Sequence, residues 1–217
     1  MLIHAGDLMQ GSGFDGLIDF NGWLAEQPHR HKVVVAGNHD WCFEQDRARS
    51  RRILSEADYL QDESVAIGGL HIWGAPWQPR LIESDTPFWA FDLPRGEALA
   101  EKWRPIPSDV DILVTHSPPF GARDEIYTGR RIGCEALEAR VAEVEPSLHV
   151  FGHVHENPGV DSATGWVSVN ACCPGGYGAP AVFDFHRDGR AEAVEVVDPG
   201  DWLPQKVLDY MERKRQR

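Results

Sequence analysis

Four short apolar segments are each followed at once by a turn that carries a side chain able to bind a metal ion. These side chains are Asp7, Asn38, His116, and the pair His153 and His155. Loops at the ends of rigid strands are where α/β proteins place reactive groups, so the four turns could converge on one point. Imidazole nitrogens combined with carboxylate and amide oxygens suit Mn²⁺, Fe or Zn²⁺ better than Ca²⁺. The pattern therefore predicts a transition-metal centre.

This ligand set suits hydrolysis of a phosphate ester, which requires charge neutralisation, an activated water and a proton for the leaving group. Two metal ions about 3.5–4 Å apart can supply the first two requirements. Asp7 is placed to bridge such a pair of ions. His153 and His155 share a face if their segment is extended, so each ring could ligate a different ion.

The segment 37–40 adds a candidate acid beside the predicted ligand Asn38. The imidazole of His39 could protonate a leaving oxygen. Asp40 could orient that ring or hold the loop. Alone, a histidine or aspartate after a strand is usually a cap, a turn residue or a surface group. It is the joint occurrence of these turns, each after a strand, that favours a metal site.

The helices and strands that must position these residues are predicted from the periodicity of apolar residues along the sequence. The pattern predicts strands over 2–5, 32–36, 64–67, 70–73, 111–115, 148–151, 167–169 and 181–185, and helices over 16–26, 47–56, 96–102 and 134–144. Gly68-Gly69 predicts a tight hairpin turn. The stretch 74–94, rich in Trp and Pro, is expected to form an ordered loop that shapes the pocket. The class is α/β.

Length and composition indicate a single domain over 1–217 that is cytoplasmic. A formal net charge of −13 disfavours a nucleic-acid polymer as partner. No apolar run has the length of a membrane span, and the first residues do not form a secretory signal. The spacing of Cys42, Cys134, Cys172 and Cys173 indicates reduced thiols rather than a zinc ribbon or disulfides.

The order Gly-Asp, Gly-Asn-His-Asp, a single His and Gly-His-x-His resembles the calcineurin-like metallophosphoesterase superfamily over nearly the whole chain. Finer likenesses point to the brain-type metallophosphodiesterases (the MPPED family) and their bacterial relatives, and lie in 2–8, 20–24, 72–77, 93–97 and 148–156. The resemblance implies an α/β sandwich of two sheets flanked by helices. It also implies a dinuclear site at strand ends and Mn²⁺-supported hydrolysis of phosphodiesters, with cyclic nucleotides among the candidates.

The resemblance also implies roles for individual residues. Asp7 would bridge the two ions. Asn38, His116 and His153 would complete one metal site, and His155 would belong to the other. His39 matches the position of the family's proton donor.

One family motif is absent from the sequence. The family's first strand carries Asp-x-His upstream of Gly-Asp, whereas here Met1 stands directly before the Gly-Asp strand. We therefore expect an N-terminally truncated domain with the first strand missing. The second metal site would then keep only Asp7 and His155, too few for tight binding. The segment 184–186, Asp-Phe-His, is a weak substitute. A misassigned start, a truncation and a natural short form remain open explanations.

These observations lead to two candidate functions, which differ in the cofactors and partners that they require. The first is a metal-dependent phosphoesterase that hydrolyses small phosphodiesters or cyclic nucleotides through a metal-bound hydroxide, with Mn²⁺ preferred over Fe or Zn²⁺ and activity weak or absent in this chain. The alternative is a catalytically impaired nucleotide- or partner-binding protein with one metal site or none. Aromatic side chains that could stack on a base are Trp73, Trp77 and Trp89, and arginines that could reach a phosphate are Arg95, Arg123, Arg130 and Arg131. A membrane is not an expected partner.

Overall fold

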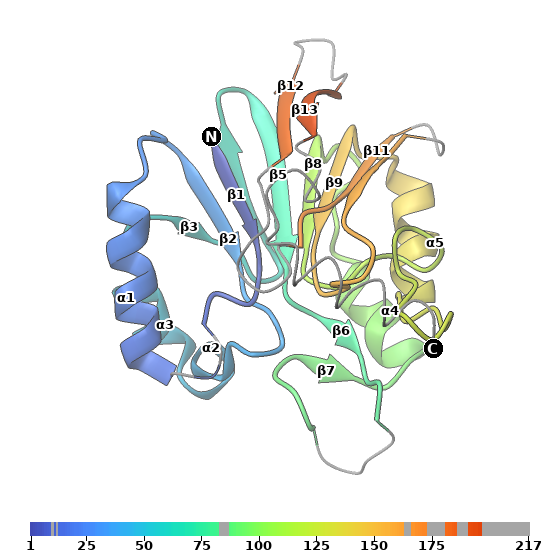
Figure 1. The fold of residues 1–217 in the computed structure, drawn as a ribbon, viewed down its shortest axis with the longest axis horizontal. Helices are drawn as coiled ribbons and strands as arrows, with labels where there is room; N and C mark the ends of the chain where they lie inside the picture. Colours follow the sequence, from blue (N-terminus) through green and yellow to red (C-terminus); the bar gives the residue numbers. More distant parts are fainter. Residues whose placement is uncertain are drawn as a thin grey trace, which may run out of the picture.

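Two β-sheets lie face to face, with helices covering the outer face of each (Figure 1). The computed structural model describes residues 1–9, 11, 13–82, 87–162 and 166–172, together with the backbone of 181–185 and 191–196. This arrangement confirms the α/β sandwich expected from the sequence.

The smaller sheet has three parallel strands in the order β1 (Leu2–Ala5), β2 (Lys32–Val35) and β3 (Asp58–Tyr59). Its outer face is covered by α1 (Gly13–Glu26), α2 (Trp41–Gln45) and α3 (Arg47–Ile53), which contribute Leu17, Leu24 and Phe43 to a common core. Among the described strands, β1 forms one edge of this sheet.

The larger sheet has six strands in the order β10 (Gly159–Asp161), β11 (Val167–Asn170), β9 (Leu148–Phe151), β8 (Ile112–Thr115), β5 (Leu70–Ala75) and β4 (Glu63–Ile67). The inner four strands are parallel and the two edge strands are antiparallel to their neighbours. The outer face packs on α4 (Glu97–Trp103) and α5 (Glu135–Val144). Two further pairs are β6 (Gln78–Pro79) with β7 (Asp92–Leu93) and β12 (Ala181–Phe185) with β13 (Ala191–Val196).

The apolar core between the sheets explains the β-branched character of their strands. In β2, Val33 and Val35 face the six-stranded sheet, whereas Val34 faces the helices, and all three are fully buried. Ile112 and Val114 of β8 meet them from the other side. A strand buried on both faces reads as a continuous apolar run, as it does here.

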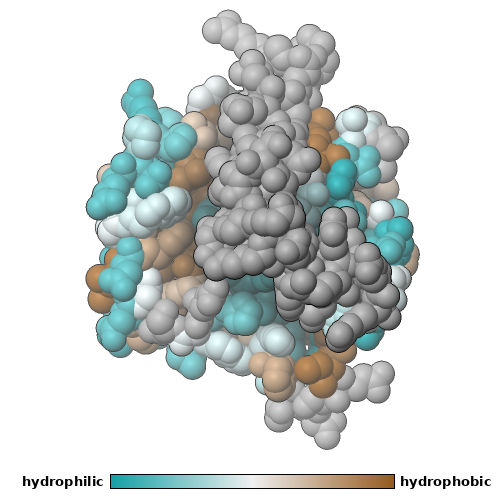
Figure 2. All heavy atoms as spheres, viewed as in Figure 1, coloured by the Kyte–Doolittle hydropathy of each residue, from teal (hydrophilic) through white to brown (hydrophobic). Residues whose placement is uncertain are grey.

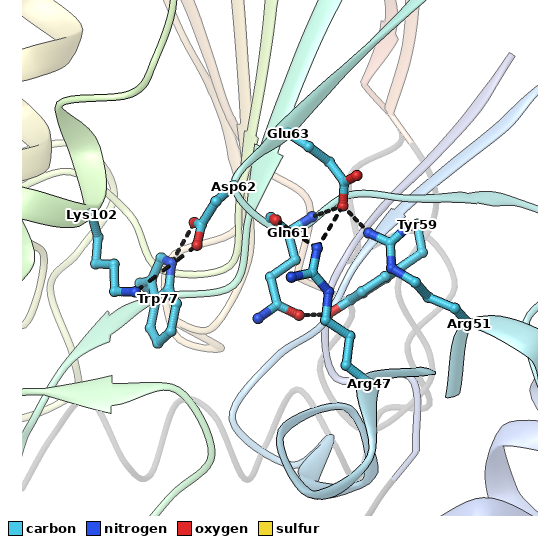
Figure 3. A network of polar contacts seen from close by, with 8 residues as sticks. All are labelled: Arg47, Arg51, Tyr59, Gln61, Asp62, Glu63, Trp77 and Lys102. Atoms are coloured by element: carbon cyan, nitrogen blue, oxygen red, sulfur yellow. Dashed lines mark hydrogen bonds and ion pairs between the residues drawn. The ribbon is translucent and has the colours of Figure 1, made fainter. Parts of the chain in front are cut away.

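A polar network also links the two halves (Figure 3). The indole N–H of Trp77 donates to Asp62 Oδ1 at 2.5 Å, and the ammonium of Lys102 in α4 lies 3.8 Å from the centre of that indole ring. The residue after Asp62, Glu63, accepts a hydrogen bond from Arg47 in α3 at 2.9 Å. The network therefore holds the beginning of the segment that leads into β6.

The surface shown in Figure 2 is hydrophilic over much of the two helical flanks. This fits the formal net charge of −13. Within the described residues, no helix combines the length and the hydropathy needed to cross a membrane.

Most predicted elements are confirmed, including the hairpin between β4 and β5. Gly68 and Gly69 form its turn with φ of 62° and 88°, a backbone region that suits glycine. The prediction of a loop over 74–94 is wrong in part, because this stretch contains the end of β5 and both β6 and β7. Two-residue strands carry no measurable period, which explains why these and β3 were not predicted. The short α2, together with β10 and β13, was not predicted either.

Burial of His149 makes a pH-dependent contribution to stability. This residue is fully buried in β9, and its Nε2 lies 2.9 Å from Thr115 Oγ1. That hydroxyl donates to Ser117 O, so it accepts from Nε2–H, and Nδ1 has no partner among the described groups. Burial lowers the pKa of His149 to about 3.

We therefore expect the free energy of unfolding to fall as the pH drops from about 6.5 toward 3, because the unfolded chain binds the proton first. The slope from this one residue is at most about 1.4 kcal/mol per pH unit. Chemical denaturation of wild type and His149→Gln at several pH values would check this. The advantage of wild type should shrink on acidification, and a constant difference would contradict the assignment.

Candidate metal centre

The turns that follow β1, β2, β8 and β9 meet at one end of the sandwich. The β1 and β2 strands are parallel and adjacent, as are β8 and β9, so their carboxyl ends lie together in each sheet. The backbone N–H of Gly152 after β9 donates to the carbonyl of His116 after β8 at 3.0 Å. The two turns of the larger sheet are thereby fixed to each other.

Four of the predicted ligands come together around the side-chain oxygen of Asn38. His116 Nε2 lies 2.8 Å and His153 Nδ1 lies 2.9 Å from Asn38 Oδ1. Asp7 Oδ1 is 3.6 Å from His116 Nε2 and accepts the backbone N–H of His39 at 3.0 Å. Each sheet supplies two members, since Asp7 and Asn38 follow strands of the smaller sheet and the histidines follow strands of the larger one.

The protonation pattern of this cluster suits a cation. His116 Nδ1 lies 2.8 Å from the carbonyl oxygen of Ala5, which can only accept, so Nδ1 carries the ring proton. Nε2 then faces the oxygens of Asn38 and Asp7, where it would offer a lone pair in the neutral ring. Electron-pair donors that face one another are stabilised by a positive ion between them. The residues present therefore fit a divalent metal, with nitrogen and oxygen ligands of the kind that transition metals accept.

Acid–base properties of the cluster agree with this assignment. Burial, reinforced by the neighbouring His116 ring, lowers the pKa of His153 to about 3, so this ring is neutral and able to ligate. Burial on its own raises the pKa of Asp7. His116, the backbone N–H of His39 and nearby histidine rings outweigh that effect, and the net pKa lies below its usual value. Asp7 is thus ionised.

Close packing of the turns depends on two glycines. A Cβ on Gly6 would lie 2.5 Å from His116 Nδ1, and one on Gly37 would lie 2.3 Å from Asp7 Oδ1. Two of the predicted ligands themselves have left-handed backbones, with φ of 59° at Asp7 and 68° at His153. Such conformations cost about 1–3 kcal/mol each in a residue other than glycine and persist only where the surroundings enforce them.

Asp40 holds the turns together. Its buried carboxyl group accepts backbone N–H groups of Gly37 at 2.7 Å, Leu8 at 3.1 Å and Met9 at 3.2 Å. Burial, and then the charge of Asp7, raises the pKa of Asp40 to about 8. Of the two roles expected for this residue, the contacts support holding the loop.

His39 and His155 are exposed and line a cavity of about 370 Å³ above the cluster, which also reaches Asp7, Asn38 and His153. Among the described residues, no group of three or more His, Cys, Asp or Glu side chains is arranged to hold a metal ion. The cluster described above is centred on the amide oxygen of Asn38. The role of His155 in a second site stays a prediction. The prediction that the segment 184–186 replaces the missing Asp-x-His motif also stays untested, because the side chains of this segment lie outside the described residues. Among the described strands, β12 pairs only with β13.

Part of the cavity lining is an apolar wall from the stretch 74–94, which the sequence predicted to shape the pocket. It is formed by Pro79, Leu81, Ile82, Phe88 and Trp89. The ring of Trp89 stands edge-on to His39, with 5.8 Å between the ring centres. Phe88 is 59% exposed within this wall. Trp73 and Trp77 instead pack in the interior and in the polar network.

Three of the four arginines considered as phosphate ligands are engaged elsewhere. Arg95 donates to the carbonyls of 132 and 133, Arg131 pairs with the buried Asp124, and Arg123 donates to the carbonyls of Pro158 and Val160. Among the described side chains that line the cavity, none belongs to lysine or arginine, whereas Asp7, Asp92 and Glu156 are acidic. An anionic ligand would therefore need a bound cation.

The chain is thus a two-sheet sandwich with histidine, amide and carboxylate side chains that converge at its strand ends. The chain belongs to the calcineurin-like phosphoesterase family, whose model matches residues 1–157. This confirms the superfamily expected from the sequence motifs.

Individual relatives agree with this assignment. The chain is 38% identical over 199 residues to the human "Metallophosphoesterase domain-containing protein 1", covering 79% of this chain and 60% of that protein. It is 37% identical to "UPF0046 protein K07C11.7" of Caenorhabditis elegans, covering 79% and 61%. The chain thus spans about three fifths of the length of these curated relatives. The solved structure of TT1561 of Thermus thermophilus superposes with a TM-score of 0.61 at 17% identity, covering 88% of this chain and 83% of that one, which supports the fold.

A matched pair of glycine substitutions tests the packing of the turns. Gly37→Ala should destabilise the protein by about 2 kcal/mol or more and weaken metal binding, because the new methyl group meets Asp7 and His116. Gly22→Ala in α1 has open space around its Cβ and should stabilise by about 0.5–1 kcal/mol. Denaturant unfolding and Mn²⁺ titration calorimetry would measure both. Equal behaviour of the two variants would refute the close approach at Gly37.

Proposed function

We propose that the protein is a metal-dependent phosphodiesterase that acts on small phosphodiesters, with nucleotides and cyclic nucleotides as candidate substrates and Mn²⁺ as the candidate metal. The observation that carries this proposal is the convergence of four side chains able to ligate a metal ion at the base of an open cavity. Membership of the calcineurin-like phosphoesterase family supports hydrolysis of phosphate esters in general.

The charge of the cavity favours a diester over a monoester. The described lining contains three carboxyl groups and no lysine or arginine, so a cation at the cluster would supply most of the attraction for a phosphate group. A diester carries one negative charge, whereas a monoester near neutral pH carries up to two. The apolar wall formed by Ile82, Phe88 and Trp89 also offers contact area for a second organic substituent.

The residues of the site divide into three tasks. Asp7, Asn38, His116 and His153 would hold a divalent cation, which supplies charge neutralisation and lowers the pKa of a coordinated water. The Ala5 carbonyl fixes the tautomer of His116 and so keeps its Nε2 free to ligate. His39 stands exposed at the rim, beside the carboxylate of Asp7, where it can donate a proton to the leaving oxygen.

Removal of a central ligand should abolish both binding and turnover. We expect Asn38→Ala and His116→Ala to lose Mn²⁺ binding by calorimetry and to lose hydrolysis of bis(p-nitrophenyl) phosphate by at least about 100-fold. Retention of both properties would sink the proposal. Tight nucleotide binding by wild type without any turnover would instead favour the alternative, a binding protein on a phosphoesterase fold.

The leaving group reveals whether His39 acts as an acid. p-Nitrophenolate departs without a proton, whereas the alkoxide released from a cyclic nucleotide needs one. His39→Ala should therefore lose about 10²–10⁴-fold in kcat with cyclic AMP but little with bis(p-nitrophenyl) phosphate, and should keep its Mn²⁺ affinity. Initial rates with both substrates would show this, and equal losses would rule out proton donation.

A further inference from the structure

The turn that carries His153 and His155 spans three strands of the larger sheet. It leaves β9, passes over the carboxyl end of β11 and enters β10, because β11 lies between those two strands. Asn170 is the last residue of β11, in register with Phe151 of β9 and Gly159 of β10. The side chain of Asn170 is therefore enclosed by the turn.

Asn170 fills this enclosed position with hydrogen bonds. It is only 2% exposed, and its Nδ2 donates to the carbonyls of Val154 at 2.7 Å and Asn157 at 2.9 Å. Its Oδ1 accepts the backbone N–H of Cys172 at 3.1 Å. Val154 is the residue between the two histidines, so one of these bonds acts directly on the backbone that connects them.

Arg123 holds the far side of the same turn. Its guanidinium donates to the carbonyl of Pro158 at 3.2 Å and to that of Val160 at 2.5 Å. Space for this group exists because residue 159 is glycine, where a Cβ would lie 2.9 Å from Arg123 Nη1. The carbonyl of Arg123 itself lies 3.5 Å from Asn170 Nδ2, which connects the two side chains.

We infer that Asn170, supported by Arg123, is a positioning residue that holds His153 and His155 in the orientation the metal site requires. The left-handed backbone of His153 is unfavourable for a histidine and needs such external restraint. The inference rests on the proposed metal-dependent function for its purpose, but the restraint itself is a property of the protein alone. Neither side chain lines the cavity. Both instead donate hydrogen bonds to backbone carbonyls of the turn.

The experiment compares Asn170→Asp with Arg140→Ala. Asn170→Asp keeps the size of the side chain and the acceptor for Cys172, but it replaces the group that donates to Val154 and Asn157. Arg140→Ala is the matched control, because Arg140 in α5 donates to the carbonyl of Ile106, outside the site. An Arg123→Met variant tests the second support.

Two readouts are measured for each variant. Hydrogen–deuterium exchange of the metal-free protein, resolved to the peptide that contains 152–160, reports the restraint directly. Titration with Co²⁺, followed by calorimetry and by its visible absorption band, reports the geometry of the histidines. For Asn170→Asp we expect faster exchange in that peptide and at least about tenfold weaker Co²⁺ binding. Both effects should be smaller for Arg123→Met. Arg140→Ala should show neither effect, even where it lowers Tm by the same amount as Asn170→Asp.

Exchange in 152–160 that rises no more than in the control overturns the inference. Faster exchange with unchanged Co²⁺ affinity and spectrum overturns it too, because the histidines would then need no such restraint. If wild type binds no Co²⁺, the proposed function is wrong, and the exchange data alone decide whether Asn170 holds the turn.

Discussion

The site exists only because two sheets are held in one relative position. Asp7 and Asn38 stand on turns of the three-stranded sheet, and His116 and His153 on turns of the six-stranded sheet, yet their donor atoms lie within 2.8–3.6 Å of a neighbour in the cluster. The apolar core between the sheets sets the spacing of the layers. Glycines at the two turns of the smaller sheet allow the side chains of Asp7 and His116 to pack against those turns, and the buried carboxyl group of Asp40 holds the turns together by hydrogen bonds.

Electrostatics assign different tasks to similar groups within this small volume. Asp7 and Asp40 both place carboxyl groups at or beside the cluster, but the pKa of Asp7 lies below its usual value whereas that of Asp40 rises to about 8. Histidine rings surround the first carboxylate, while the second is fully buried beside another negative charge. One is therefore suited to a cation, and the other to backbone N–H groups.

The sequence was sufficient for those parts of the site whose signal is local. A buried strand followed at once by Gly-Asp, Gly-Asn-His-Asp or Gly-His-x-His can be recognised from neighbouring residues, and the structure brings Asp7, Asn38, His116 and His153 together. The pairing of β6 with β7 could not be predicted, because each contributes two residues with no period and their partners are distant in the chain. Asn170 also carried no signal, since its partners are backbone carbonyls, which every residue has.

The division of the four donors between the sheets has a thermodynamic consequence for the whole domain. A cation bound by all four side chains would cross-link the two sheets, which otherwise meet through apolar packing and a polar network. Any species that binds only the folded state adds RT ln(1 + [L]/Kd) to the free energy of unfolding, about 2.7 kcal/mol at a hundredfold excess over Kd. Cohesion between the layers and loading of the site would then form one coupled equilibrium, so the supply of metal would set what fraction of the sandwich is folded.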